Sequence, residues 1–389
     1  MSDAPPALID PVELTRDLIR RPSVTPVDAG AMDLIETLLT GLGFHCRRMN
    51  FEGIENLYAR RGTASPNLCF AGHTDVVPTG TAAAWTAGPF EAEVHDGILY
   101  GRGAVDMKGG IAAWIAAVSR LLAEGEPAGS LSFLITGDEE GPALHGTKRV
   151  VQTLMAEGET IDACVVGEPS SSLHLGDMIK IGRRGSLNSW ITVHGKQGHV
   201  AYPDRAANPA PVLAKLLTAL NDHVLDEGYP EFPPSNLEIT TITIDNDASN
   251  VIPAEARARL NIRFNPTHTG DELIAWLNVQ AGLAQVASGQ RIELEHLCSG
   301  NAFLTEPGPF ISAVQDAVEA VCGHRPEAST TGGTSDARFI RAMCPVLELG
   351  LVGQTMHQID ERVPVAEIEA LTGVYQRVIA TVFERLSGD

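Results

Sequence analysis

Metal-capable side chains follow four predicted apolar strands, and one more lies in the turn before a predicted helix. In chain order they are His73 and Asp75, Asp106, Glu139 and Glu140, Glu168, and His357. The carboxyl ends of the strands in an open α/β sheet form one edge, and ligands bind there. We therefore expect these side chains to converge on one site.

The residue types in this set favour zinc. Two imidazoles with three carboxylates mix nitrogen and oxygen ligands in the way that Zn²⁺ accepts. Five ligands are too many for one open catalytic zinc, but they suit two zinc ions that share a bridge. Two Zn²⁺ ions carry +4, and three carboxylates with a bridging hydroxide carry −4, so the buried cluster would be neutral and avoid the cost of uncompensated charge.

Two further acids have positions that suit supporting roles. Asp75 lies two residues after His73, so both side chains share one side of an extended chain. We expect Asp75 to orient the imidazole and raise its basicity. Glu139 and Glu140 are adjacent and point in different directions, so one can bind metal while the other exchanges protons with the attacking water and the leaving group.

The elements that position these residues predict an α/β fold. Uninterrupted apolar strands alternate with helices such as Gly109–Gly125, which favours a mostly parallel sheet covered by helices. From about Gly185 to Cys298 the strands instead alternate apolar and polar residues, as half-exposed antiparallel strands do. The order strand–helix–strand–strand–helix–strand there predicts a smaller α+β, ferredoxin-like domain. We expect it to span 184–297, inserted between two parts of a catalytic domain, 1–183 and 298–389.

Composition excludes some partners. With 49 acidic and 28 basic residues among 389, the formal net charge is −21, which disfavours nucleic acid and anionic membranes. None of the six cysteines forms a C-x-x-C motif, so nothing requires an oxidising compartment. The N-terminal segment has acids and prolines where a signal peptide is apolar, and no apolar run approaches the ~20 residues of a membrane span. We expect a cytoplasmic protein.

Five segments, taken in order, carry a resemblance to a known family. GHTDVVP, GRGAVDMKGG, TGDEEG, VGEP and the late TMH resemble the di-zinc metallopeptidase and deacylase family that includes aminoacylases, carboxypeptidases and acetylornithine deacetylase. The resemblance implies an enzyme with two Zn²⁺ ions per subunit, which Co²⁺ could replace, and a small-molecule substrate. The ligands that it implies are Asp106 between the metals, His73 and Glu168 on one, and Glu140 and His357 on the other. Glu139 would be the general acid/base.

Other segments resemble the desuccinylase branch of this family, which cleaves N-succinyl-L,L-2,6-diaminopimelate to succinate and L,L-diaminopimelate. They are GRRGSL, GHVAYPDRAANP, SNVIP and GGTSDARF. The resemblance implies that His199, from the inserted domain of a partner subunit, stabilises the oxyanion, so that the enzyme is a homodimer whose insert acts as lid and dimerisation domain. The implied substrate contacts are Arg183, Ser186, Tyr202, Asn250, Gly333 and Thr334.

The residue types agree with these contacts. Arg183 can hold a substrate carboxylate with two parallel hydrogen bonds. GGTSDARF predicts a loop that enters a helix at Thr334, where free N–H groups would favour an anion.

Three alternatives stand beside this interpretation. A sister hydrolase, such as an aminoacylase, acetylornithine deacetylase or dipeptidase, would differ in the acyl group that it releases. A non-catalytic relative would lack Glu139 or a ligand, and all of these residues are present. A nucleotide-binding protein would need a complete glycine-rich loop, and GRGAVD lacks the third glycine and the preceding strand.

Overall fold

The computed structural model describes residues 8–386, and within them the chain forms two compact units. Unit 1 comprises the residues up to Ile181, Thr305–Ser329, and the residues from Ser335 onward. Unit 2 comprises Gly182–Leu304 and Thr330–Thr334. Residues 1–7, part of the segment argued above not to be a signal peptide, lie outside the described residues.

Unit 1 is built on one large sheet with the strand order β1-β2-β6-β3-β7-β18-β8-β17. Its strands are β1 (His45–Phe51), β2 (Ile54–Arg61), β3 (Asn67–His73), β6 (Ser130–Thr136), β7 (Ala163–Val166), β8 (Met178–Lys180), β17 (Glu327–Ser329) and β18 (Val346–Glu348). The neighbouring strands β6, β3, β7 and β18 run parallel, whereas β1, β2 and β8 bring in antiparallel pairs. The predicted α/β fold with a mostly parallel central sheet is confirmed.

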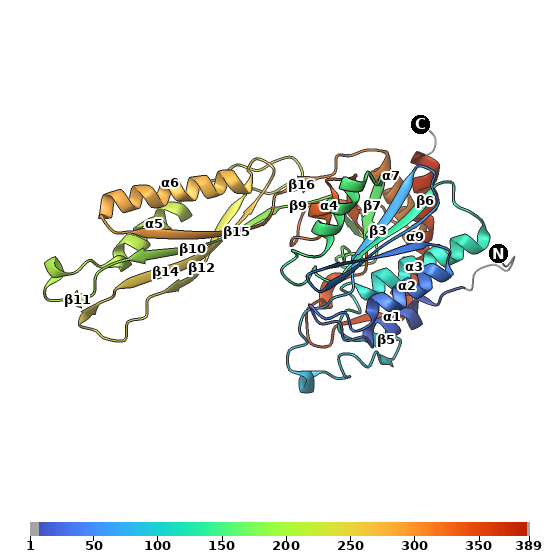
Figure 1. The fold of residues 1–389 in the computed structure, drawn as a ribbon, viewed down its shortest axis with the longest axis horizontal. Coiled ribbons are helices and arrows are strands. Elements are labelled where there is room, and N and C mark those ends of the chain that lie inside the picture. The colour runs from blue at the N-terminus through green and yellow to red at the C-terminus, as the bar shows by residue number, and fades with distance from the viewer. Residues whose placement is uncertain (1–7, 387–389) are drawn as a thin grey trace. The chain divides into compact units, whose positions relative to one another are not determined.

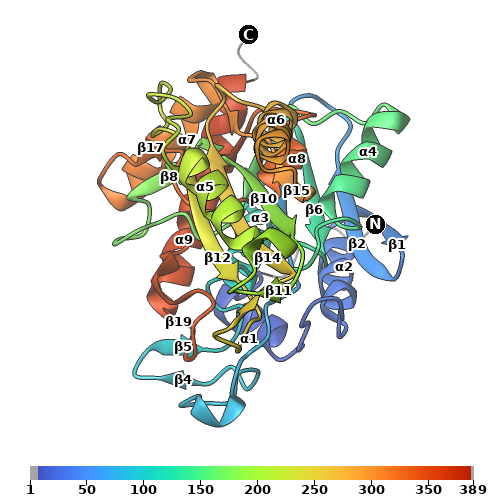
Figure 2. The same cartoon turned by 90° about the vertical axis from the view of Figure 1, so that its left-hand side faces the viewer.

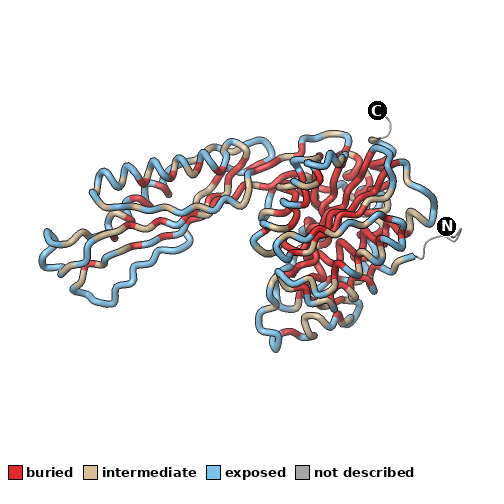
Figure 3. The backbone as a smooth tube through the Cα atoms, in the orientation of Figure 1, coloured by how far each residue is buried: buried red, intermediate tan, exposed pale blue. Residues whose placement is uncertain are grey.

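The helices of unit 1 cover this sheet. They are α1 (Pro11–Ile19), α2 (Ala31–Gly41), α3 (Lys108–Glu124), α4 (Thr147–Glu157), α7 (Pro309–Cys322), α8 (Ala337–Ile340) and α9 (Val365–Leu386). Helices α3 and α9 lie on one face and α4 on the other (Figure 1). Between the sheet and its first layer of helices, Phe70 stacks on Trp114 at 4.8 Å between ring centroids, and Tyr375 packs edge-on against Trp114 at 4.8 Å. The strands under this layer are almost wholly buried (Figure 3).

Short elements complete unit 1. A small sheet joins β4 (Val94–His95), β5 (Ile98–Tyr100) and β19 (Arg362–Pro364), and 3-10 turns occupy Ala82–Ala84 and Gly353–Thr355. No helix among residues 8–386 is long and apolar enough to cross a membrane.

Unit 2 is a four-stranded antiparallel sheet, ordered β12-β14-β10-β15, with two helices on one face (Figure 2). Its main elements are β10 (Gly185–His194), α5 (Pro209–Asn221), β12 (Asn236–Thr243), β14 (Glu255–Phe264), α6 (Gly270–Ser288) and β15 (Ile292–Gly300). Alternate residues of β14, from Ala256 to Phe264, are buried against the helices, which is the period-2 pattern of a half-covered sheet. The predicted order of strands and helices is therefore observed.

Small paired elements finish unit 2. β9 (Gly182–Arg183) pairs with β16 (Phe303–Leu304), and β11 (Gly198–His199) pairs with β13 (Val251–Ile252); a 3-10 turn spans Pro203–Arg205.

Candidate metal centre and active site

Three parallel strands deliver the first ligands to one edge of the sheet. β6, β3 and β7 are adjacent and parallel, so their carboxyl ends lie together. His73 is the last residue of β3, Glu139 and Glu140 lie in the loop after β6, and Glu168 follows β7. His357 departs from the expectation: β18 ends at Glu348, and the histidine lies beyond it, after the 3-10 turn Gly353–Thr355.

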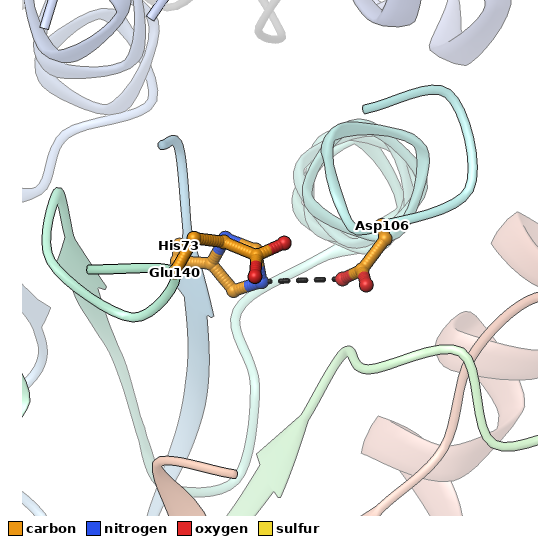
Figure 4. A group of neighbouring side chains, drawn as sticks. All are labelled: His73, Asp106 and Glu140. Atoms are coloured by element: carbon orange, nitrogen blue, oxygen red, sulfur yellow. Dashed lines mark hydrogen bonds and ion pairs between the residues drawn. The ribbon is translucent and has the colours of Figure 1, made fainter. Parts of the chain in front are cut away.

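Asp106 lies between two imidazoles. Its Oδ1 is 3.2 Å from Nε2 of His73, and its Oδ2 is 3.2 Å from Nε2 of His357. Figure 4 shows the carboxylate reaching from the loop before α3 toward His73, with Glu140 beside the imidazole. His73 Nε2 is also 3.7 Å from Glu168 Oε1, and His357 Nε2 is 2.9 Å from Glu140 Oε1. The five expected ligands thus form two groups that share Asp106.

A close backbone approach allows this arrangement. A Cβ added to Gly110, in the first turn of α3, would lie 2.6 Å from the carbonyl oxygen of Gly167. Real Cβ atoms do not come so close, so a glycine is needed where the start of α3 meets the end of β7. Asp106 precedes that helix and Glu168 follows that strand, so the glycine lets the two carboxylates share one site.

The donor set fits divalent metal ions. His73, Asp106 and Glu140 each offer one ligand atom, all within 4.8 Å of one another, and so do His73, Glu139 and Glu168. Burial raises the pKa of Glu168 well above its usual value, and the neighbouring Asp106 adds to the effect. Several carboxylates gathered out of water need positive charge to compensate them.

The same carboxylates favour the protonated form of both imidazoles. Burial lowers the pKa of His73, but its hydrogen bond with Asp106 and the charge of Glu168 outweigh burial and raise it well above the usual value. Hydrogen bonds with Asp106 and Glu140 raise the pKa of His357 to about 10. A bound cation would displace these protons, because an imidazole ligand must be neutral.

Asp75 supports the site through two different groups. Its backbone carbonyl oxygen lies 2.8 Å from Nδ1 of His73, whereas its carboxylate Oδ1 is 3.7 Å away. The carboxylate instead accepts hydrogen bonds from the backbone N–H groups of Glu139 (3.2 Å) and Glu140 (3.0 Å). Burial raises the pKa of Asp75 to about 6. Asp75 therefore fixes the turn that bears both glutamates, while its carbonyl faces the imidazole.

Glu139 has surroundings suited to proton transfer. Burial raises its pKa well above the usual value, and the nearby Asp336 raises it further. Arg338 Nη1 lies 4.0 Å from Glu139 Oε1. The sequence interpretation missed both Asp336 and Arg338, although both lie in the GGTSDARF segment.

The expected substrate contacts all lie in unit 2, in two groups. In the first, Arg183 donates a hydrogen bond to the carbonyl of Thr331 at 3.0 Å. Gly332 has a φ of +110°, and a Cβ there would collide with the Arg183 guanidinium.

Ser186 is buried in β10 and accepts a hydrogen bond from Asn261 (3.2 Å). Gly333 and Thr334 continue the Thr330–Thr334 segment of the same unit.

The second group gathers around the β11–β13 pair. Val200 N–H donates to the carbonyl of Asn250 (3.0 Å), next to His199. The ring centroids of His199 and Tyr202 are 5.7 Å apart, and His199, Tyr202 and Asn250 are all exposed.

The helix expected to begin at Thr334 begins later. α8 starts at Ala337, has four residues, and is preceded by Asp336 as N-cap. Ser335 and Asp336 turn into the buried interior of unit 1, where Ser335 Oγ bonds Glu348. The N–H groups near Thr334 are therefore not those of a helix N-terminus, and the helix-based argument for an anion site there was wrong.

Comparison with known proteins shows the family to which this chain belongs. The family model of peptidase family M20/M25/M40 matches residues 69–381, and the chain belongs to this family. The family membership that the sequence motifs predicted is confirmed.

Within the family, the chain is similar in sequence to a named desuccinylase and similar in fold to solved M20 structures. It is 63% identical to the succinyl-diaminopimelate desuccinylase of Phenylobacterium zucineum over 377 residues, covering 97% of this chain and 99% of that one. An M20 family metallo-carboxypeptidase from Sulfolobus solfataricus shares the fold with a TM-score of 0.82 at 16% identity, covering 96% and 99% of the two chains. A dinuclear metal-binding M20 peptidase from Bacillus subtilis shares it with a TM-score of 0.72 at 16% identity, covering 97% and 98%.

Proposed function

We propose that this chain hydrolyses the succinyl amide of N-succinyl-L,L-2,6-diaminopimelate to succinate and L,L-diaminopimelate, using two zinc ions per subunit. The observation that carries the proposal is the pair of ligand groups that share Asp106, in a chain 63% identical to a desuccinylase over nearly its whole length. His73 and Glu168 would hold one metal, and Glu140 and His357 the other. Such metals, Zn²⁺ or Co²⁺ in its place, polarise an amide carbonyl and lower the pKa of water.

Glu139 would move the proton in this reaction. A carboxylate buried beside the metal ligands can take a proton from the attacking water and give it to the departing amine. Asp75 would hold Glu139 in place through the backbone N–H that it binds. His199 would stabilise the oxyanion from the partner subunit.

Basic side chains in unit 2 would receive the carboxylates of the substrate. Arg183 is buried, with Gly332 making room for its guanidinium. Burial and the neighbouring Arg184 both lower the pKa of Arg263, and within residues 8–386 its guanidinium has no carboxylate partner. Like charges held together in this way favour an anionic ligand. Ser186, Tyr202, Asn250, Gly333 and Thr334 would complete the contacts.

A homodimer formed through unit 2, which would also act as a lid, fits the surface of that unit. Helix α6 exposes Val279, Leu283 and Val286 at helical spacing, and the edge strand β12 exposes Ile242. An exposed apolar stripe and an uncovered sheet edge favour association, and a two-fold dimer pairs the same surface of both copies. The six cysteines are unpaired, as in a reducing cytoplasm.

Comparing two substrates tests the activity. The Zn²⁺-loaded protein is expected to release succinate from the succinyl substrate and to act far more slowly on N-acetylornithine, which lacks the distal carboxylate and leaves a buried cation unpaired. Arg183→Ala should slow the reaction and reduce the preference for the succinyl substrate over N-acetylornithine. Comparable kcat/KM values on the two substrates would refute the desuccinylase assignment and favour a sister deacylase.

A further inference from the structure

Two of the candidate metal ligands do not closely follow a strand of the large sheet. Asp106 lies in the turn before α3, and His357 lies in the loop before β19. The His357 side chain is 48% exposed, so packing does not fix it. Its φ is +61°, and that of Asp360 is +58°, a region that non-glycine residues adopt only where the surrounding structure holds them. Other contacts must hold this loop in place.

One buried carboxylate joins the two loops. Glu361 is wholly buried, four residues after His357. Its Oε1 accepts hydrogen bonds from the N–H groups of Val105 (2.9 Å) and Asp106 (3.1 Å), and its Oε2 accepts from Gly103 (3.0 Å). The Glu361 carboxylate, which belongs to the loop of His357, thus binds the backbone N–H of Asp106 directly.

Arg102 extends this connection. Its Nη1 donates to Glu361 Oε2 at 2.7 Å and to the carbonyl of Gln358 at 3.2 Å, and its Nη2 donates to the carbonyl of Pro78 at 3.3 Å. The guanidinium lies 5.3 Å from the centre of the Trp85 ring. Gln358 is the neighbour of His357, and Pro78 lies in the segment that follows Asp75. Arg102 and Glu361 therefore join the Asp106 turn and the His357 loop to the segment that follows His73 and Asp75.

We propose that Arg102 and Glu361 form a positioning pair that sets the spacing of Asp106 and His357 and thereby the affinity of the metal bound by these two residues and Glu140. The proposal rests on the two-metal function proposed above. Neither residue touches the metal position; both act through the backbones of the ligand loops. Partners of this kind typically contribute 10–100-fold to metal affinity.

Glu361→Gln is the sharpest test, because it keeps the side-chain volume. Both carboxylate oxygens accept hydrogen bonds, so either orientation of the amide turns its NH₂ toward a donor. Zn²⁺ affinities of the full-length chain are measured by competition with a chelator. We expect the metal of Asp106, Glu140 and His357 to bind 10–100-fold more weakly, and the metal of His73 and Glu168, which shares only Asp106 with it, to weaken less. The absorption spectrum of the Co²⁺-loaded variant should also differ from that of the wild type.

Asp162→Asn is the matched control. Asp162 also accepts a backbone hydrogen bond, from Asn67 at 2.6 Å, and one from Ser65 Oγ at 3.1 Å, but at the start of β3, whose other end carries His73. The Asp162→Asn substitution should lower the melting temperature and leave both metal affinities unchanged. Arg102→Lys, which keeps the charge but loses the forked contacts, decides the matter if Glu361→Gln does not fold.

The outcomes separate the two proposals. A wild-type chain that binds fewer than two metals overturns the two-metal function. Two tight metals in the wild type and equally tight metals in the folded Glu361→Gln or Arg102→Lys chain overturn the positioning pair alone. An equal loss of affinity in Asp162→Asn also overturns it, because the effect would then follow general destabilisation.

Discussion

Two buried glutamates of the site, Glu139 and Glu168, have different neighbours. Glu139 and Glu168 are both buried acids with raised pKa values, and each offers an oxygen within 4.8 Å of a His73 nitrogen. Glu139 differs in that it also lies beside Asp336 and Arg338. We propose that Glu168 binds metal, whereas Glu139 gains and loses a proton during the reaction.

Replacing Glu139 tests whether this residue moves protons or binds metal. Glu139→Ala should keep both metals and lower kcat by roughly 10²–10⁴-fold, the usual contribution of general acid–base catalysis. Metal analysis and steady-state kinetics are measured on the same preparation, with Glu168→Ala as the variant that should lose metal. A Glu139→Ala enzyme with near-normal kcat would contradict the assignment.

His357 gives a second residue-level prediction. His357→Ala removes a donor from the group that contains Glu140 and leaves His73 with Asp106 and Glu168. One metal should therefore be lost more readily than the other during dialysis against a chelator, as measured by metal content per chain. Simultaneous loss of both metals would show that the two positions do not bind independently.

Sequence reasoning could assemble the residues of this site but not all of its contacts. The expected ligands converge because three of their strands are parallel neighbours, which is a property of the fold class. That the carbonyl of Asp75, rather than its carboxylate, makes the short contact with His73 depends on local backbone geometry that spacing does not reveal.

At the level of elements, long periodic segments were predictable and short ones were not. The observed α3 matches the expected helix Gly109–Gly125 to within one residue at each end, because its many apolar residues enforce one period. The His357 loop and α8 were misplaced. Their conformations come from tertiary bonds such as those of Glu361 and Ser335, to partners distant in sequence.

A turn in unit 2 yields a pH-dependent prediction. The Asp226 carboxylate accepts hydrogen bonds from Gly228, Ser235 and Asn265, and His268 lies 3.3 Å away. Burial raises the pKa of Asp226, but the hydrogen bonds outweigh it, and the pKa is lowered overall. Because the pKa of Asp226 is lower in the folded state, its charged form stabilises the fold at pH values above the unfolded-state pKa of about 3.9. This stabilisation is lost as the pH falls through the folded-state pKa.

Asp226→Asn should therefore destabilise unit 2 most at neutral pH and progressively less below about pH 4. The free energy of unfolding is measured by urea titration at several pH values, with Asp204→Asn, on an exposed turn of the same unit, as control. A difference between wild type and Asp226→Asn that does not shrink in acid would show that the carboxylate is not held in its charged form.

For the whole molecule, the proposed homodimer predicts complementation. Glu139 lies in unit 1 and His199 in unit 2, so Glu139→Ala and His199→Ala disable different units. Mixed dimers should regain one working site if His199 serves the partner's metal centre. Activity is measured after subunit exchange, which is verified by mass spectrometry of differently tagged chains. Exchange without recovery would contradict action across the dimer.

The pairing of β9 with β16 has a consequence for how the chain folds. Gly182 and Leu304, the two ends of the inserted segment, are cross-strand partners, so a folded insert leaves and rejoins unit 1 at one place. β7 and β18 pair although the whole insert separates them in the chain. Closing a loop costs entropy that grows with its length, and contacts between distant residues slow folding. An insert that folds first shortens this loop, so weakening unit 2 should delay the formation of the central sheet of unit 1.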